Sequence, residues 1–180
     1  MRVIYTALLL SLLVGCAGPG TVAPREYLDE KTAATITVVA DPWVFANDRS
    51  ASGDERDFLN VYAIDVNRQG DHRQYLAVLQ WWPPPGMSST PTLELQSQDR
   101  TIPLRPVLTS ARELGISQPL VTSHPPASKW WYFPVDKQIL GAIARSQNVR
   151  ATFVSDDARI EYIMWRDGRA DVAELTDALQ

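Results

Sequence analysis

The two histidines are the side chains best suited to act as a general base, so their surroundings decide what chemistry to expect. His72 follows Asp71 in a predicted turn, and His124 follows Ser123 in a proline-rich stretch. A serine hydrolase needs a serine, a histidine base and a carboxylate that meet in space, and adjacency in the sequence does not establish this. The chain contains neither a Gly-x-Ser-x-Gly turn nor a His-Glu-x-x-His zinc motif. Hydrolysis through His124 is therefore the least favoured hypothesis, and we expect no enzymatic activity and no catalytic residue.

Oxygen-bearing side chains recur at the spacing of a calcium-binding loop. Asp65, Asn67, Gln69 and Gly70 fit the first half of such a loop, in which positions one, three and five supply ligands and position six is glycine. Position twelve, which needs a bidentate glutamate, is Leu76. Without that carboxylate, the residues indicate a turn between two strands. We therefore expect no metal site and no cofactor.

Paired tryptophans are the most distinctive residues in the chain. Trp81 and Trp82 precede three prolines, and Trp130 and Trp131 lie in an aromatic run. Neighbouring residues of a strand point to opposite faces of the sheet, so both members of a pair cannot enter one core. Either loops and a helix cap the outer rings, or these rings form a surface for a glycan or a protein. Trp82, Trp130 and Trp131 are the candidate binding residues.

The charged and sulfur-containing residues exclude several classes of function. The chain has 17 Lys and Arg against 21 Asp and Glu, for a net charge of −4, and the basic residues do not cluster. Proteins that bind nucleic acid carry a basic patch or stripe, so we expect no nucleic-acid partner. Cys16 is the only cysteine. If it is modified, neither a cysteine nucleophile nor a thiolate metal site is left.

The amino-terminal residues have the features of a secretory signal peptide. Arg2 supplies a positive charge, and twelve apolar or small residues follow, from Val3 to Val14. This run is too short to span a bilayer, which takes about 20 apolar residues. Its length fits the hydrophobic region of a signal peptide. A strand of a cytosolic fold, or an ordinary signal peptide with a chance cysteine, would be the alternatives.

The end of this run, Leu13-Val14-Gly15-Cys16, resembles the lipobox of bacterial lipoprotein precursors. The resemblance implies cleavage before Cys16, attachment of lipid to its thiol and acylation, as with palmitate, of the new amino terminus. Residues 1–15 would be the signal peptide, and 16–24 the lipidated cysteine and a flexible tether. Ala17 stands where an aspartate would favour inner-membrane retention. We therefore expect an anchor on the periplasmic face of the outer membrane, or on the outer face of the cell membrane in a Gram-positive organism.

The remaining residues, 25–180, predict a single domain of mainly β structure. Alternating or β-branched apolar runs separated by turn residues indicate strands and hairpins at 34–40, 42–46, 58–66, 73–82, 92–96, 101–108, 148–155 and 158–165. A capping-box sequence begins a helical turn at Ser110, Asp136 is the expected N-cap of a helix over 136–146, and helical spacing returns over 170–179. The elements favour a β-sandwich of about seven to nine short antiparallel strands with two or three short helices.

These observations predict where the protein works better than what it does there. The leading hypothesis is a lipid-anchored lipoprotein of the cell envelope, without enzymatic activity, whose β domain is an interaction or assembly module for an envelope protein. The alternative is a protein that binds cell-wall glycan, or peptidoglycan, through exposed tryptophans. An envelope hydrolase is the third hypothesis.

Overall fold

The computed structural model describes residues 23–48, 56–83, 90–97, 100–155 and 158–179. Cys16, the apolar run before it and most of the expected tether lie outside these residues, so the anchor stays a prediction. Within the described part of the chain, no helix combines the length and the apolar character needed to cross a membrane.

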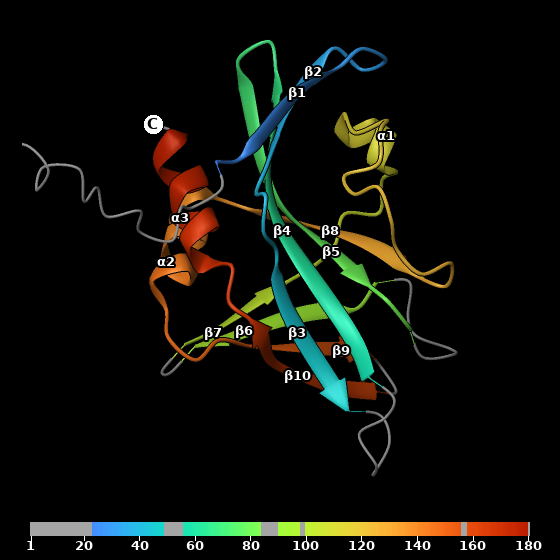
Figure 1. The fold of residues 1–180 in the computed structure, drawn as a ribbon, viewed down its shortest axis with the longest axis vertical. Helices are drawn as coiled ribbons and strands as arrows, with labels where there is room; N and C mark the ends of the chain where they lie inside the picture. The colour runs from blue at the N-terminus through green and yellow to red at the C-terminus, as the bar shows by residue number, and fades with distance from the viewer. Residues whose placement is uncertain (1–22, 49–55, 84–89, 98–99, 156–157, 180) are drawn as a thin grey trace, which may run out of the picture.

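Ten strands and three short helices form the described structure (Figure 1). In chain order they are β1 (Arg25–Asp29), β2 (Ala34–Val38), β3 (Trp43–Asp48), β4 (Arg56–Arg68), β5 (Asp71–Gln80), β6 (Thr92–Ser97), β7 (Arg100–Leu104), α1 (Ala111–Leu114), β8 (Lys129–Val135), α2 (Lys137–Arg145), β9 (Arg150–Ser155), β10 (Ala158–Arg166) and α3 (Arg169–Ala178). The predicted β-rich, sandwich-like fold is confirmed, with one strand more than expected.

The hairpin of β4 and β5 turns where the sequence predicts it. Gln69 and Gly70 have φ values of 56° and 91°, which suit a two-residue hairpin turn. The Gly70 N–H donates to Oδ1 of Asn67 at 2.8 Å. This turn sets the register of the two strands, so that Asn67 lies opposite His72 and Asp65 opposite Gln74.

β4 lies at the centre of the sheet and is its longest strand. β2 and β3 pair one after the other with one edge of β4, and β5 pairs with its other edge. From β3 the sheet continues through β10, β9, β6 and β7, and from β5 it continues to β8, with every pair antiparallel. The sheet curves so strongly that its two ends approach each other: the backbone N–H of Val107, just after β7, donates to the carbonyl of Tyr132 in β8 at 2.8 Å.

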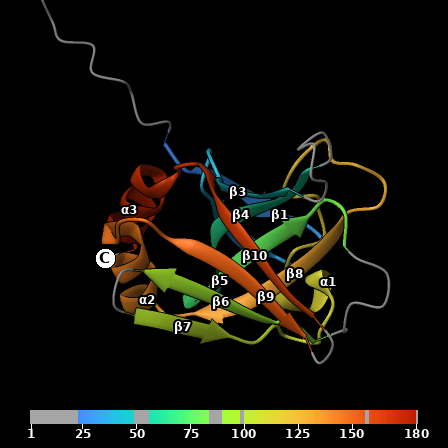
Figure 2. The same ribbon diagram turned by 90° about the horizontal axis from the view of Figure 1, so that it is seen from below.

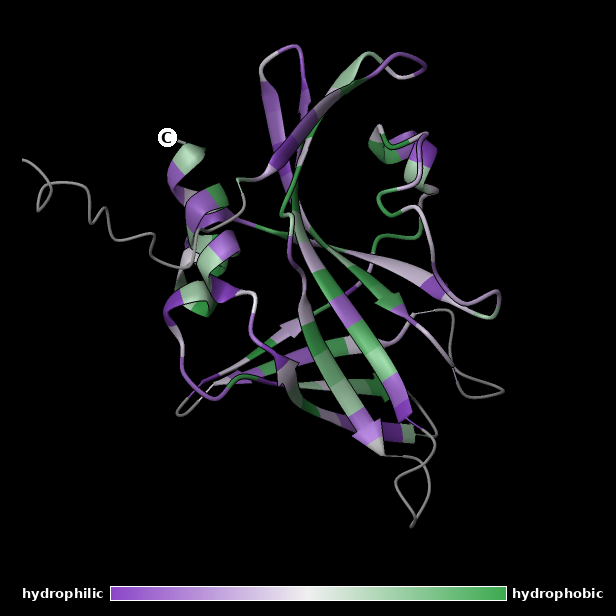
Figure 3. Cartoon of the chain, in the orientation of Figure 1, coloured by the Kyte–Doolittle hydropathy of each residue, from purple (hydrophilic) through white to green (hydrophobic). Residues whose placement is uncertain are grey.

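The curvature brings the two arms of the sheet face to face around the core (Figure 2). The rings of Trp131 and Phe133 in β8 lie 6.2 and 6.1 Å from the ring of Phe153 in β9, measured between centroids. Figure 3 shows hydrophobic and hydrophilic residues interspersed along β4, whereas β3 is hydrophobic over most of its length and hydrophilic at its end. Burial of these apolar side chains is the main stabilising contribution to the fold.

Residues 105–128, which include α1, cover part of the outer face of β2, β4 and β5. Ile116 is buried in the core cluster, and Leu114 packs against it. The capping box predicted at the start of α1 is present, because the Ser110 side chain accepts from the Glu113 N–H and the Glu113 carboxylate accepts from the Ser110 N–H. Gly115 ends the helix with φ of 106°.

The other two helices pack side by side at one edge of the sheet (Figure 1). The Asp136 carboxylate accepts from the Ile139 N–H at 2.6 Å, so Asp136 is the N-cap of α2, as predicted. Leu140 of α2 and Leu175 of α3 are buried. The end of α3 lies beside the inner face of β2, β4 and β5, and a pocket lies between them.

Candidate functional site

The three tryptophans predicted to bind a partner or ligand lie in different environments. Trp82, just after β5, is 41% exposed. Trp130 is half-buried and stacks on Tyr132, with 6.2 Å between the ring centroids. Trp131 is only 5% exposed, because its ring enters the core between the two arms of the sheet. Of these three, Trp82 presents the most open ring to a partner.

An exposed group of aromatic side chains surrounds the first residues of β4. The Phe58 ring lies 5.0 Å from the Trp81 ring and 6.3 Å from the Trp165 ring, between centroids. Trp165 of β10 is 57% exposed, and Ile163, two residues earlier on the same strand, is exposed as well. We name Phe58, Trp81, Ile163 and Trp165 the aromatic surface.

Sequence reasoning did not single out Trp165, although a signal for it exists. In β10 the apolar side chains occupy both sets of alternating positions, with Tyr162 buried and its neighbour Ile163 exposed. A strand with one face in the core and one in water shows alternation. The unbroken apolar run from 162 to 165 therefore indicated that the outward face of this strand is also apolar.

A buried polar cluster of Asp57, Gln80 and Tyr162 lies on the inner side of the sheet, beneath the aromatic surface. The Tyr162 hydroxyl donates to Oδ2 of Asp57 at 2.6 Å, and Nε2 of Gln80 donates to the Tyr162 oxygen at 3.0 Å. Oδ1 of Asp57 accepts from the backbone N–H of Trp82 at 3.0 Å. Since all three side chains of the cluster are buried, these bonds are shielded from water and fix the backbone at Trp82.

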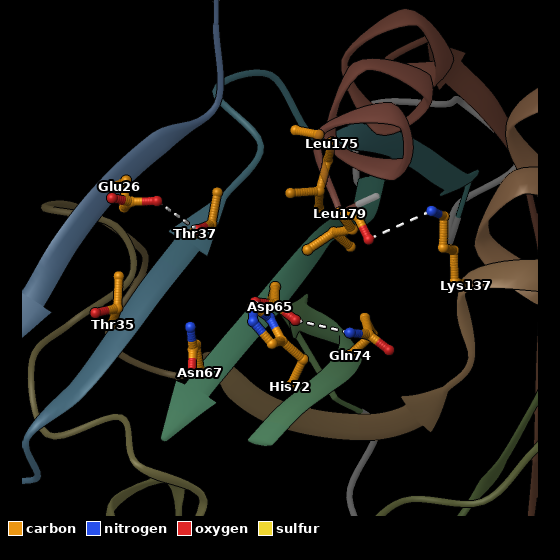
Figure 4. A pocket seen from close by; sticks show the side chains of 11 residues that line it. Glu26, Thr35, Thr37, Asp65, Asn67, His72, Gln74, Lys137, Leu175 and Leu179 are labelled. Atoms are coloured by element: carbon orange, nitrogen blue, oxygen red, sulfur yellow. Dashed lines mark hydrogen bonds and ion pairs between the residues drawn. The ribbon is translucent and has the colours of Figure 1, made fainter. Parts of the chain in front are cut away.

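The second candidate region is a polar pocket around Asp65 and His72 (Figure 4). Oδ2 of Asp65 lies 2.7 Å from Nδ1 of His72, and Oδ1 accepts from Nε2 of Gln74 at 2.7 Å. The Asp65 side chain is almost fully buried, whereas that of His72 is about half exposed. The register of β4 and β5 creates this group, because residues 65, 72 and 74 point to the same face.

The pocket encloses about 340 Å³ and combines a polar floor with an apolar wall. The floor is formed by strand residues that include Glu26, Thr35, Thr37 and Asn67, and α3 supplies Leu175, Ala178 and Leu179. Nζ of Lys137, from α2, donates to the Leu179 carbonyl at 3.3 Å across the edge of the pocket. This volume lies at the lower end of the range of small-molecule sites, but the lining is more polar than theirs usually is.

The two histidines lie in different environments in the structure. His72 contacts Asp65 and not its sequence neighbour Asp71, which pairs with Arg73 at 2.8 Å. His124 is exposed, and its Nδ1 lies 3.1 Å from the carbonyl of Pro125. Among the residues that the structure describes, no three His, Cys, Asp or Glu side chains are grouped to hold a metal ion. The Asp65 carboxylate can orient His72 and its ring proton, which is the chemical capacity of this region.

Comparison of the chain with protein-family models, with curated proteins and with solved structures finds no match. The function is therefore argued from the two regions described above.

Proposed function

We propose that this protein is a lipid-anchored interaction or assembly module of the bacterial cell envelope, without enzymatic activity, and that the aromatic surface binds an envelope protein. In a Gram-negative cell the anchor would lie on the periplasmic face of the outer membrane. In a Gram-positive cell it would lie on the outer face of the cell membrane. The observation that carries the proposal is the exposed Trp165 ring, which lies beside Phe58 and the exposed Ile163 on the outer face of the sheet.

The composition of the aromatic surface supports protein binding. Tryptophan and arginine are enriched among the residues that dominate binding energy at protein interfaces. Here the guanidinium carbon of Arg56 lies 4.5 Å from the centre of the Trp165 ring, and Phe58 packs against the same ring. The backbone of Trp82 is fixed by Asp57. Because these side chains are already ordered, a partner would meet a surface that loses little conformational entropy on binding.

The expected anchor limits where such a partner can be found. Eight residues separate Cys16 from Arg25, the first residue of β1. A fully extended chain spans at most about 3.3–3.6 Å per residue, so the tether reaches no more than about 30 Å. A partner of the aromatic surface would therefore be a protein of the same membrane or of the wall layer next to it.

Site-specific photocrosslinking in intact cells tests the proposal. A photoreactive amino acid at position 165 should capture one defined envelope protein, and the same amino acid at the exposed Leu108 should not. The substitution Cys16→Ala should release the protein from the membrane fraction. Repeated failure to capture a protein at position 165 would refute the interaction, and continued membrane association of Cys16→Ala would refute the anchor.

Cell-wall glycan is the second candidate ligand, and the open ring of Trp82 is the observation that favours it. A sugar ring can stack on such an aromatic face. Soluble wall fragments should then shift the tryptophan emission of the protein, and Trp82→Ser should abolish the shift. An emission spectrum that stays unchanged up to millimolar fragments would exclude this ligand.

A further inference from the structure

The floor of the polar pocket consists of two rows of polar side chains, and each row has one member from β2, one from β4 and one from β5. The strand register pairs Thr37, Asp65 and Gln74 in the first row, and Thr35, Asn67 and His72 in the second. Cross-strand neighbours on one face have Cβ atoms about 4.5–5.5 Å apart, and rows two residues apart are separated by about 7 Å. All six side chains line the pocket, so a single ligand in it meets both rows.

Hydrogen bonds within the chain determine which atom of each amide is left for a ligand. Oδ1 of Asn67 accepts from the Gly70 N–H at 2.8 Å, so the remaining atom is Nδ2, which donates. Nε2 of Gln74 donates to Oδ1 of Asp65 at 2.7 Å, so the remaining atom is the oxygen, which accepts. The Thr35 hydroxyl can do both. The floor therefore offers donors and acceptors together.

Two further side chains fit a ligand that carries hydroxyl groups. Nδ1 of His72 faces the Asp65 carboxylate, which leaves Nε2 for a ligand. A hydroxyl can donate to Nε2 or accept from it, so it fits the neutral and the charged ring equally. Glu26 lies opposite Thr37 and extends the first row. Its carboxylate accepts from the Thr37 hydroxyl at 3.4 Å and has further lone pairs for a hydroxyl of a ligand.

We infer that this pocket binds a neutral sugar of one ring. Each sugar hydroxyl both donates and accepts, so one molecule can bond to both kinds of group in the floor, whereas an ammonium or a carboxylate satisfies only one kind. The C–H groups of the ring would pack against Leu175 and Leu179, which Figure 4 shows across the pocket from the polar rows. The volume of about 340 Å³ suits a ligand of this size. The inference does not depend on lipidation or on the aromatic surface.

Neutral sugars and an analogue without hydroxyls test this inference. We suggest titrating the isotope-labelled full chain, purified in detergent, with glucose, galactose, mannose and N-acetylglucosamine, and with tetrahydropyran, which has the ring of glucose without its hydroxyls. At least one sugar should move the methyl NMR signals of Thr35 and Thr37 and reach saturation. The imidazole signals of His124, which is exposed and lies outside the pocket, should stay in place. Tetrahydropyran should move none of these signals.

Matched asparagine substitutions test the contribution of a single donor. Asn67→Asp keeps the oxygen that accepts from Gly70 and replaces the donor with an acceptor, so it should weaken sugar binding at least about tenfold. Asn148→Asp makes the same change at an exposed position outside the pocket and should bind sugar as the unchanged protein does. Thr35→Val keeps the shape of the side chain, removes a hydroxyl and should weaken binding about fivefold.

Four results would overturn the inference. Absence of any shift with all four sugars would show that the pocket does not bind them. Equal shifts with tetrahydropyran would mean that the apolar wall alone binds the probe. Unchanged affinity in both Asn67→Asp and Thr35→Val would exclude recognition by the floor. Loss of the threonine shifts in Trp82→Ser would place the sugar at the other candidate glycan site, because Trp82 does not line the pocket.

Discussion

Replacing Asp29 tests how residues 105–128 are attached to the outer face of the sheet. Its buried carboxylate accepts from the Lys31 N–H at 3.1 Å, the Ser117 hydroxyl and N–H at 2.6 and 2.5 Å, and the Gln118 N–H at 3.2 Å. These bonds join the turn after β1 to the segment that covers the outer face. Burial disfavours the charged form, but the hydrogen bonds together outweigh it and lower the pKa of Asp29 from 3.8 to about 2.

The substitution Asp29→Asn keeps the size of this side chain and changes its hydrogen-bonding capacity. The charge is lost, and one acceptor oxygen becomes an amide group that can only donate. At least one N–H of Ser117, Gln118 or Lys31 then faces a donor in a buried position. Each unsatisfied buried group costs about 1–3 kcal/mol, so the free energy of unfolding at neutral pH should fall by about 2–4 kcal/mol.

Urea unfolding followed by tryptophan fluorescence, repeated from neutral to acidic pH, measures this effect. Because the folded-state pKa of Asp29 lies below the unfolded value, its contribution is present above the unfolded pKa of 3.8 and is lost as the pH falls toward about 2. The difference in unfolding free energy between the protein and Asp29→Asn should therefore shrink over this range. Asp177→Asn, at an exposed position, is the matched control. A loss below about 0.5 kcal/mol, or one that does not change with pH, would refute the reasoning.

Three further predictions concern other parts of the fold. Gly115→Ala should destabilise the protein by about 1–3 kcal/mol in urea unfolding, because φ is 106° and a Cβ would lie 3.0 Å from Cγ1 of Val66; a neutral effect would contradict this. Trp43→Ala should lower the free energy of unfolding by about 3–5 kcal/mol, since the Trp43 ring is buried. Trp165→Ser should lower it by about 1 kcal/mol or less, and losses of similar size in both variants would show that Trp165 is a core residue. Burial raises the pKa of Tyr132 from 10.0 to about 12, so stability should fall between these pH values, and Tyr132→Phe should remove that part of the fall.

The local elements of this fold could be predicted where the signal lies within a few residues. The turn at Gln69 and Gly70 and the helix starts at Ser110 and Asp136 each depend on a side chain that bonds to the backbone three residues away. The residue types within such a short segment are enough to predict these bonds. β1 was not predicted, because its sequence mixes charged and apolar residues without alternation, and among the described strands it pairs with β2 alone.

The candidate sites could be predicted only in part, because they depend on the register of the strands and the curvature of the sheet. The contact between Asp65 and His72 requires the residue pairing of β4 and β5, which the position of His72 after Asp71 in the chain does not reveal. Trp131 was a candidate binding residue because only one ring of the Trp130–Trp131 pair can enter the core. The strong curvature instead places β9 over it, and the ring packs against Phe153.

The aromatic surface and the polar pocket lie near opposite ends of β4, and in each a buried aspartate of this strand orients a neighbouring group. Asp57 and Asp65 are both buried residues on the inner face of β4, and each carboxylate orients a group nearer to solvent: the backbone of Trp82 in one case and the imidazole of His72 in the other. Eight residues of extended strand separate the two carboxylates, a distance of about 26 Å. Changes at sites so far apart, without shared partners, act independently. Substitutions at the aromatic surface and in the polar pocket should therefore have additive effects on the free energy of unfolding.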